Sequence, residues 1–250
     1  MKQVSLCGAA AVVYCMLGAS MGAGVFAAPP AVSLREQAQQ LFEPLEAVAD
    51  PADTPARIEL GRRLFTETAL SINRTQSCSS CHPLDGAHAG MDNKPVSLGF
   101  EQQRGDRNTP TVLNARFDLA HFRDGRAKDL VTQAKGPILS PTEMGLPSAE
   151  VATARLRELP YASAFADAFP GQADPVTFDN AAAAIAAFER TLVSTSRFDD
   201  WLRGDETALT PSEQRGLDRF IDLGCTACHV GPGVGGGRFV KSGVVNPYPH

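Results

Sequence analysis

The sequence has no excess of basic residues: 23 Lys and Arg residues stand against 28 Asp and Glu residues, which gives a net charge of −5 at pH 7. A nucleic-acid-binding surface needs concentrated positive charge, so this composition argues against that class of function. Aromatic residues are also scarce, at 7%, and Trp201 is the only tryptophan. No stretch alternates apolar and polar residues convincingly enough to indicate a sheet, so the sequence predicts helices joined by loops.

A long apolar run occurs once, between Leu6 and Phe26, and no second one follows. It ends in small residues, with Ala27 just before the expected cleavage point, and the glycines and prolines in and after it argue against a membrane anchor. We therefore expect residues 1–27 to be a signal peptide that is removed together with Cys7 and Cys15. The expected location is the periplasm.

The remaining cysteines fall in two copies of one pattern, Cys-x-x-Cys-His, at residues 78–82 and 225–229. Two thiols one helical turn apart can both bond to the vinyl groups of a porphyrin, and the adjacent histidine can be the proximal iron ligand. A four-thiolate zinc site would leave both histidines unexplained, and a disulfide across two residues is more usual in redox motifs. The pattern therefore predicts two covalent haem c groups, held by Cys78, Cys81 and His82 and by Cys225, Cys228 and His229.

Helix start and stop signals accompany the apolar periodicity. Asp53 or Thr54 can cap a helix whose apolar residues share one face, and Ser148 can cap a short helix that ends before Pro160. Residues 178–192 read as an alanine-rich helix with a continuous apolar face. These segments predict a mainly α fold.

The clearest start signal is a capping box, in which Thr210 and Glu213 flank a proline at the first helical position. This helix is expected to run to Gly224 and to lead into the second haem motif. Loops rich in glycine and proline span residues 83–112 and 136–149. Loops this long are unusual in a compact domain, but a large apolar cofactor supplies the burial that they lack.

Several segments extend the two haem motifs in a fixed order. Taken together they closely resemble the bacterial di-haem cytochrome c peroxidases, in the segments 107–114, 124–130, 133–137, 141–144, 225–239 and 244–248. The resemblance implies a mainly α fold of two cytochrome-c-like haem domains. Residues 28–194 would form the N-terminal peroxidatic domain and residues 195–250 the C-terminal electron-transfer domain.

The resemblance also implies roles for individual residues. His82 would be the proximal ligand of the peroxidatic haem and His229 that of the electron-entry haem. Glu143 matches the family's distal acid, which takes a proton from peroxide and returns it to the departing oxygen. Gln133 matches a residue of the same pocket, and Asn108 matches a contributor to a calcium site between the haems.

The function implied is reduction of hydrogen peroxide to water, with electrons from a small periplasmic cytochrome c or copper protein. Two alternatives remain at this point. One is a di-haem electron carrier without turnover, and the other is a di-haem enzyme that oxidises a protein substrate to mature its quinone cofactor. The expected assemblies include a homodimer.

The sequence departs from the family pattern at three places. It ends at His250 with no methionine after Met144, so we expect an incomplete second domain that lacks the family's methionine ligand. Arg123 stands where the family usually has a tryptophan between the haems. Phe100 falls where many members carry a histidine on the peroxidatic iron, and it predicts an apolar ring over an open distal face. His88 is the competing histidine on the same loop.

Overall fold

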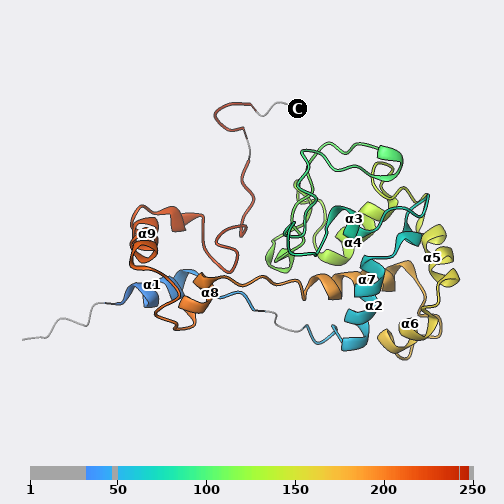
Figure 1. Cartoon of the computed structure of the whole chain (residues 1–250), viewed down its shortest axis with the longest axis horizontal. Helices are drawn as coiled ribbons and strands as arrows, with labels where there is room; N and C mark the ends of the chain where they lie inside the picture. Colours follow the sequence, from blue (N-terminus) through green and yellow to red (C-terminus); the bar gives the residue numbers. More distant parts are fainter. Residues whose placement is uncertain (1–31, 47–49, 242, 248–250) are drawn as a thin grey trace, which may run out of the picture. The chain divides into compact units, whose positions relative to one another are not determined.

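The computed structural model describes residues 32–46, 50–241 and 243–247, and the expected signal peptide lies outside them. Within these ranges the chain is helical and contains no β-strand, only two isolated bridges. The helices in chain order are α1 (Leu34–Leu41), α2 (Pro55–Phe65), α3 (Cys78–Cys81), α4 (Leu130–Leu139), α5 (Ala149–Glu158), α6 (Ala162–Ala168), α7 (Phe178–Glu189), α8 (Arg197–Leu202) and α9 (Pro211–Asp222) (Figure 1). Four short 3-10 turns join them: η1 (Thr68–Leu70), η2 (Phe100–Gln102), η3 (Ala115–Phe117) and η4 (Cys225–Ala227). No helix in the described ranges is long and apolar enough to cross a membrane.

The larger core is built around α7, which packs against α2, α4 and α5. The alanines of α7 other than Ala183 are fully buried and let its neighbours approach closely. The closest approach is at Gly61 on α2, where an added Cβ would lie 1.9 Å from the carbonyl oxygen of Ala184. Glycine is therefore the residue that this crossing of α2 and α7 requires.

The capping residues expected from the sequence are the ones that begin the helices. Thr54 accepts a hydrogen bond from the backbone N–H of Arg57, and Ser148 accepts one from Val151. The capping box of α9 is present between Thr210 and Glu213. The prediction for residues 178–192 was too long, because α7 ends at Glu189 and the chain then turns.

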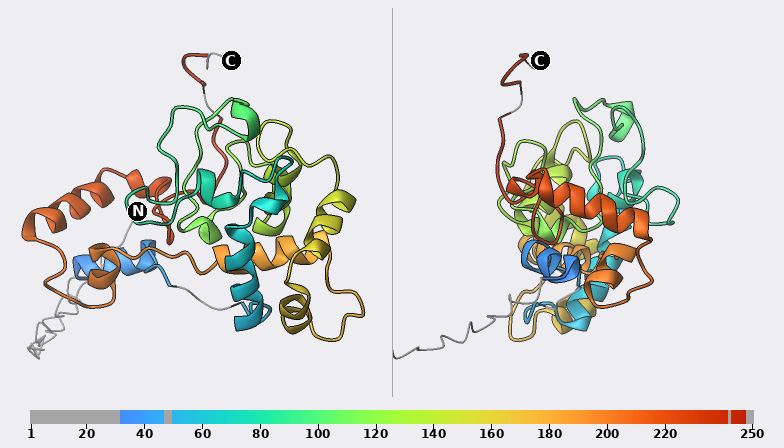
Figure 2. Two further views of the ribbon diagram at one scale, coloured as in Figure 1. Left: turned by 45° about the vertical axis from the view of Figure 1, so that its right-hand side comes forward. Right: turned by 90° about the vertical axis from the view of Figure 1, so that its left-hand side faces the viewer.

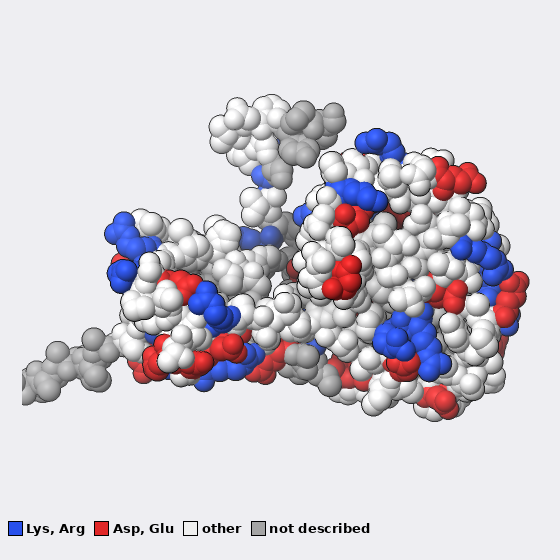
Figure 3. Space-filling model, viewed as in Figure 1, with Lys and Arg blue, Asp and Glu red and all other residues white. Residues whose placement is uncertain are grey.

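A second, smaller cluster consists of α1, α8 and α9, which lie together in Figures 1 and 2. Phe42 packs edge-on against Phe198, with ring centroids 5.4 Å apart, and Trp201 is buried beside them. This cluster joins a helix from the beginning of the described chain to two helices from its end. Acidic and basic side chains are interspersed on the face shown in Figure 3, in keeping with the balanced composition.

The long loop before α4 is held by scattered hydrogen bonds. Val112 donates its backbone N–H to Gly90, and the Thr111 hydroxyl donates to the carbonyl oxygen of Ala89. The backbone N–H of Phe100 donates to the carbonyl oxygen of Glu143 at 2.8 Å. The loop is thereby docked on the turn that follows α4.

Candidate functional site

The first Cys-x-x-Cys-His motif lies in the wall of a cavity of about 630 Å³, within the range of cavities that bury a cofactor-sized ligand. Cys78 and Cys81 are the ends of the single-turn helix α3, and both line the cavity. The backbone N–H of His82 donates to Cys78 at 2.9 Å, which continues the turn. Burial raises the pKa of both thiols, so both stay protonated near neutral pH.

The His82 imidazole is oriented as an iron ligand requires. Its Nδ1 lies 2.9 Å from the carbonyl oxygen of Gly90, and since a carbonyl can only accept, Nδ1 carries the proton. The lone pair is therefore on Nε2. Burial lowers the pKa of His82 and keeps the ring neutral. A neutral histidine fixed through Nδ1 by a backbone carbonyl is the usual form of a metal ligand.

The second motif has the same local arrangement. Gly224, at φ 75°, ends α9 and starts the turn η4, and His229 donates its backbone N–H to Cys225 at 3.0 Å. The His229 Nδ1 lies 3.0 Å from the carbonyl oxygen of Val234, and Phe220 on α9 packs edge-on against the ring. Both motifs thus present two thiols and one Nε2 lone pair, the donor set that fits haem c.

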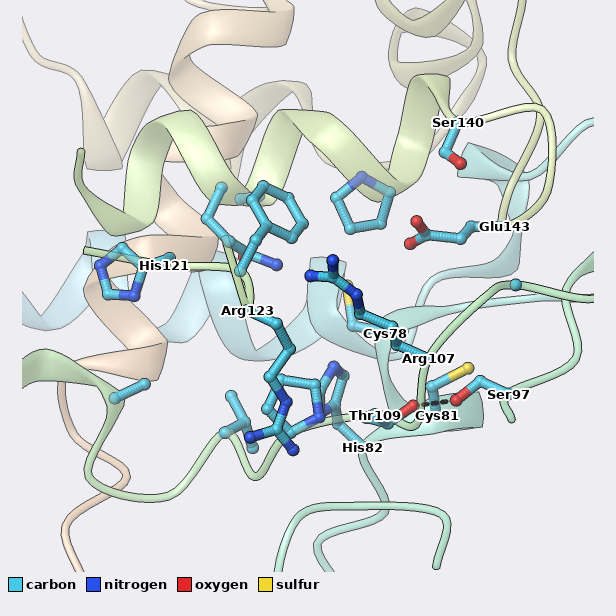
Figure 4. A pocket seen from close by; sticks show the side chains of 18 of the residues that line it. Cys78, Cys81, His82, Ser97, Arg107, Thr109, His121, Arg123, Ser140 and Glu143 are labelled. Atoms are coloured by element: carbon cyan, nitrogen blue, oxygen red, sulfur yellow. Dashed lines mark hydrogen bonds between the residues drawn. The ribbon is translucent and has the colours of Figure 1, made fainter. Parts of the chain in front are cut away.

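Another part of the cavity wall carries the expected acid. Gln133 and Pro137 line the cavity from α4, and Glu143 lines it from the turn beyond. Figure 4 shows the Glu143 carboxylate and His82 entering the pocket from different sides. Burial raises the pKa of Glu143, while a hydrogen bond with Ser140 and the charge of Arg126 act in the opposite direction.

Cationic side chains stand at the rim of the cavity. Arg107 and Arg123 both line it, and Figure 4 shows both side chains in the pocket. Arg123 donates to the Asn108 side-chain oxygen at 3.4 Å. The guanidinium of Arg126 lies 3.5 Å from the centre of the Phe122 ring. The residue at the expected inter-haem position is therefore a cation in contact with the expected calcium ligand.

The structure corrects the position expected for Phe100. Its ring does not cover the cavity, because it packs on Gly145, whose added Cβ would lie 2.4 Å from Phe100 Cε1. Gly145, at φ 74°, has the left-handed backbone that glycine tolerates. His88 is held on the exposed loop by Asp85, with Nδ1 2.9 Å from Oδ1. Among the described residues, neither Phe100 nor His88 lines the cavity.

One residue of the cavity wall was missed by the sequence analysis. Glu189, at the end of α7, is only 6% exposed and lines the cavity together with Ile185, one turn earlier. The next residue, Arg190, forms a two-bond ion pair with Asp53 at 2.5 and 2.6 Å. The sequence did contain a signal for this residue. Glu189 lies on the apolar face of an alanine-rich helix, where a charged side chain is unexpected.

The sequence profile of the di-haem cytochrome c peroxidases matches residues 55–207. Cytochrome c551 peroxidase from Pseudomonas aeruginosa is 44% identical over 228 residues, which cover 88% of this chain and 65% of that protein. The methylamine utilization protein MauG from Paracoccus denitrificans is 40% identical over 209 residues, covering 73% of this chain and 53% of MauG. The chain thus spans between half and two thirds of the length of these relatives.

Solved structures agree with the fold. A MauG-like protein associated with microbial copper homeostasis has a TM-score of 0.65 at 32% identity, over 80% of this chain and 59% of its own. The di-haem peroxidase BthA from Burkholderia thailandensis has a TM-score of 0.60 at 27% identity, over 75% of this chain and 52% of its own. The mainly helical fold is confirmed. The chain belongs to the di-haem cytochrome c peroxidase family, which implies haem c cofactors.

Proposed function

We propose that this protein is a periplasmic peroxidase that reduces hydrogen peroxide to water at a first haem. Its electrons would come from a small cytochrome c or copper protein and enter at a second haem. The observation that carries the proposal is a single cavity with the first Cys-x-x-Cys-His motif in one part of its wall and the half-buried acid Glu143 in another. Residues 28–194 would hold the peroxidatic site and residues 195–250 the electron-entry site, after removal of residues 1–27.

The residues at the first motif suit a covalently held haem. Cys78 and Cys81 would form its thioether bonds, and His82 would bind its iron through Nε2, the nitrogen left free by Gly90. Haem bound there would supply the iron that binds hydrogen peroxide and gives it electrons.

Glu143 would move the proton on which cleavage of the O–O bond depends. Its carboxylate would take a proton from one oxygen of hydrogen peroxide and return it to the other oxygen, which leaves as water. The raised pKa of this carboxyl suits both steps, because it makes the carboxylate a better proton acceptor than an ordinary glutamate while the acid can still release the proton. Gln133, on the same side of the cavity, would orient the peroxide through its side-chain amide.

The second motif would receive the electrons. Cys225 and Cys228 would hold this haem, and His229 would bind its iron. Arg123 stands at the expected inter-haem position, and a guanidinium offers no readily oxidised ring. Relatives named MauG are among the similar proteins, but an enzyme that oxidises a protein through an inter-haem tryptophan is disfavoured by this residue.

A calcium ion and a homodimer complete the proposal. Asn108 would give its side-chain oxygen to calcium, a hard cation that prefers oxygen ligands. That oxygen now accepts the hydrogen bond from Arg123, so calcium would replace the guanidinium as its partner.

Steady-state turnover tests the proposed activity. The protein is produced with a haem-attachment system, and hydrogen peroxide consumption is followed with a reduced small cytochrome c as donor. We expect sustained turnover that Glu143→Gln lowers by about 10²–10⁴-fold without loss of haem. Haem groups that are reduced and reoxidised without consuming peroxide would instead identify an electron carrier.

A further inference from the structure

Glu189 is a buried carboxyl with no assigned role. Its residue is 6% exposed, and among the described residues no group hydrogen-bonds to its Oε2. The side chain lines the same cavity as Cys78 and Cys81, but from α7 rather than from the turn that carries Glu143. An unpaired carboxylate in such a place is unfavourable, because charge is poorly solvated in the interior.

The charged groups around α7 interact with residues other than Glu189. On the same helix end, Arg190 is paired with Asp53. From α3 the facing titratable group is Cys78, which becomes an uncharged thioether when haem is attached. Arg116 of η3 donates to the carbonyl oxygen of Arg190.

The charged side chains of the helices packed against α7 likewise have partners other than Glu189. On α2, Glu59 pairs with Arg62 and Arg63, and Arg57 lies over the Phe169 ring. Lys135 of α4 pairs with Asp179, at the other end of α7. The remaining charged side chains are on α5. Arg155 donates to backbone carbonyls of the segment 69–72, and Arg157 pairs with Asp174. Glu158 pairs with Arg74, and Glu150 hydrogen-bonds with Ser148.

This environment favours the neutral form of the carboxyl. Burial raises the pKa of Glu189 to about 8, and the charge of Arg190 offsets only part of that effect. Near neutral pH the group is therefore close to its own titration. A change of one charge in the adjoining cavity is then enough to change its protonation.

We propose that Glu189 takes up a proton when the first haem is reduced and releases it when that haem is oxidised. One electron from the donor lowers the charge of the haem iron by one, and one proton from water converts the Glu189 carboxylate to the carboxylic acid. The two charges cancel, so the buried site keeps its net charge. The proposal rests on the proposed function, because it requires haem at Cys78 and Cys81.

The reduction equilibrium of the first haem, measured against pH, tests this coupling. Optical redox titrations are run on the haem-loaded protein over a pH series that spans the Glu189 pKa of about 8. The first haem is assigned by its loss from the Cys78→Ala/Cys81→Ala variant. For one proton and one electron, each tenfold fall in proton concentration should disfavour reduction up to tenfold, which is about 59 mV.

Three variants separate the carboxyl's role from a structural one. Glu189→Gln keeps the size of the side chain but cannot titrate, so the potential of the first haem should become independent of pH over this range. Glu189→Asp keeps a carboxyl on a shorter side chain and should move the sloping region to a different pH, which attributes the slope to residue 189 if Glu189→Gln does not accumulate; an unmoved slope in Glu189→Asp would overturn the inference. Glu143→Gln, a carboxyl change elsewhere in the cavity, should leave the slope in place.

The outcomes distinguish this inference from the activity on which it rests. A flat wild-type potential, or a slope that persists unchanged in Glu189→Gln, overturns the inference while peroxide turnover still stands. Absence of haem at the first motif overturns the proposed function and the inference together. A slope that only the Glu189→Gln change removes supports the coupling.

Discussion

The ion pair between Asp53 and Arg190 should be one of the strongest single contributions to the stability of the haem domain. It joins the residue before the α2 cap to the residue after α7, with hydrogen bonds of 2.5 and 2.6 Å. The Asp53 side chain is 4% exposed and that of Arg190 is 22% exposed. Asp53→Ala would leave the guanidinium without its partner in a largely dry position.

The expected cost follows from these exposures. Removing one partner of a fully buried pair costs about 3–5 kcal/mol, and the partial access of water to Arg190 reduces this to about 2–3 kcal/mol. At about 2–4 °C per kcal/mol for a chain of this size, Tm should fall by about 4–12 °C. Thermal unfolding of the haem-loaded protein, followed by far-ultraviolet circular dichroism, measures the change.

The exposed pair of Arg157 and Asp174 is the matched control. Their side chains are 54% and 61% exposed, so Asp174→Ala should cost less than about 1 kcal/mol. If Asp53→Ala lowers Tm no more than Asp174→Ala does, the reasoning from burial is refuted.

Three further predictions concern the haem sites. The mature protein should keep two haems through denaturing electrophoresis, since thioether bonds survive it; retention of fewer than two would contradict the assignment of both motifs. Glu143→Gln should lower turnover by about 10²–10⁴-fold. In the wild-type protein, kcat/KM should fall as the pH decreases through the pKa of Glu143, because the base must be deprotonated. Burial raises that pKa above the ordinary glutamate range, and Glu143→Gln should remove this pH dependence. Near-wild-type activity of Glu143→Gln would remove Glu143 from the mechanism. The oxidised protein should react with peroxide without prior reduction, because Phe100 cannot bind iron and packs on Gly145; a low-spin paramagnetic resonance signal that His88→Ala abolishes would show that His88 occupies the site.

Local signals predicted most of the helical framework. The caps at Thr54, Ser148 and Thr210 were correct because capping is a short-range interaction between a side chain and the next turn. The end of α7 was placed too late, since the apolar periodicity continues to Leu192 after the helix has ended at Glu189. Helix ends depend on backbone partners that a periodic pattern does not contain.

The site was predictable only where the residues are close in sequence. The two cysteines and the histidine of each Cys-x-x-Cys-His motif lie within five consecutive residues, so their spacing in the sequence was enough to identify them. Glu143 came from the resemblance, and its presence in the cavity with Cys78 is confirmed by the structure, while its role stays a prediction. Glu189 and the packing of Phe100 on Gly145 depend on contacts between distant segments, which one sequence does not reveal.

The hydrogen bonds of the two motif histidines have a consequence for the order in which the protein matures. His82 is oriented by a carbonyl eight residues further along the chain, and His229 by one five residues further along. Contacts across such short loops form in well under a microsecond. Each imidazole thus takes its orientation from residues near its own motif, and attachment of the proposed haem at one motif would not have to wait for folding at the other.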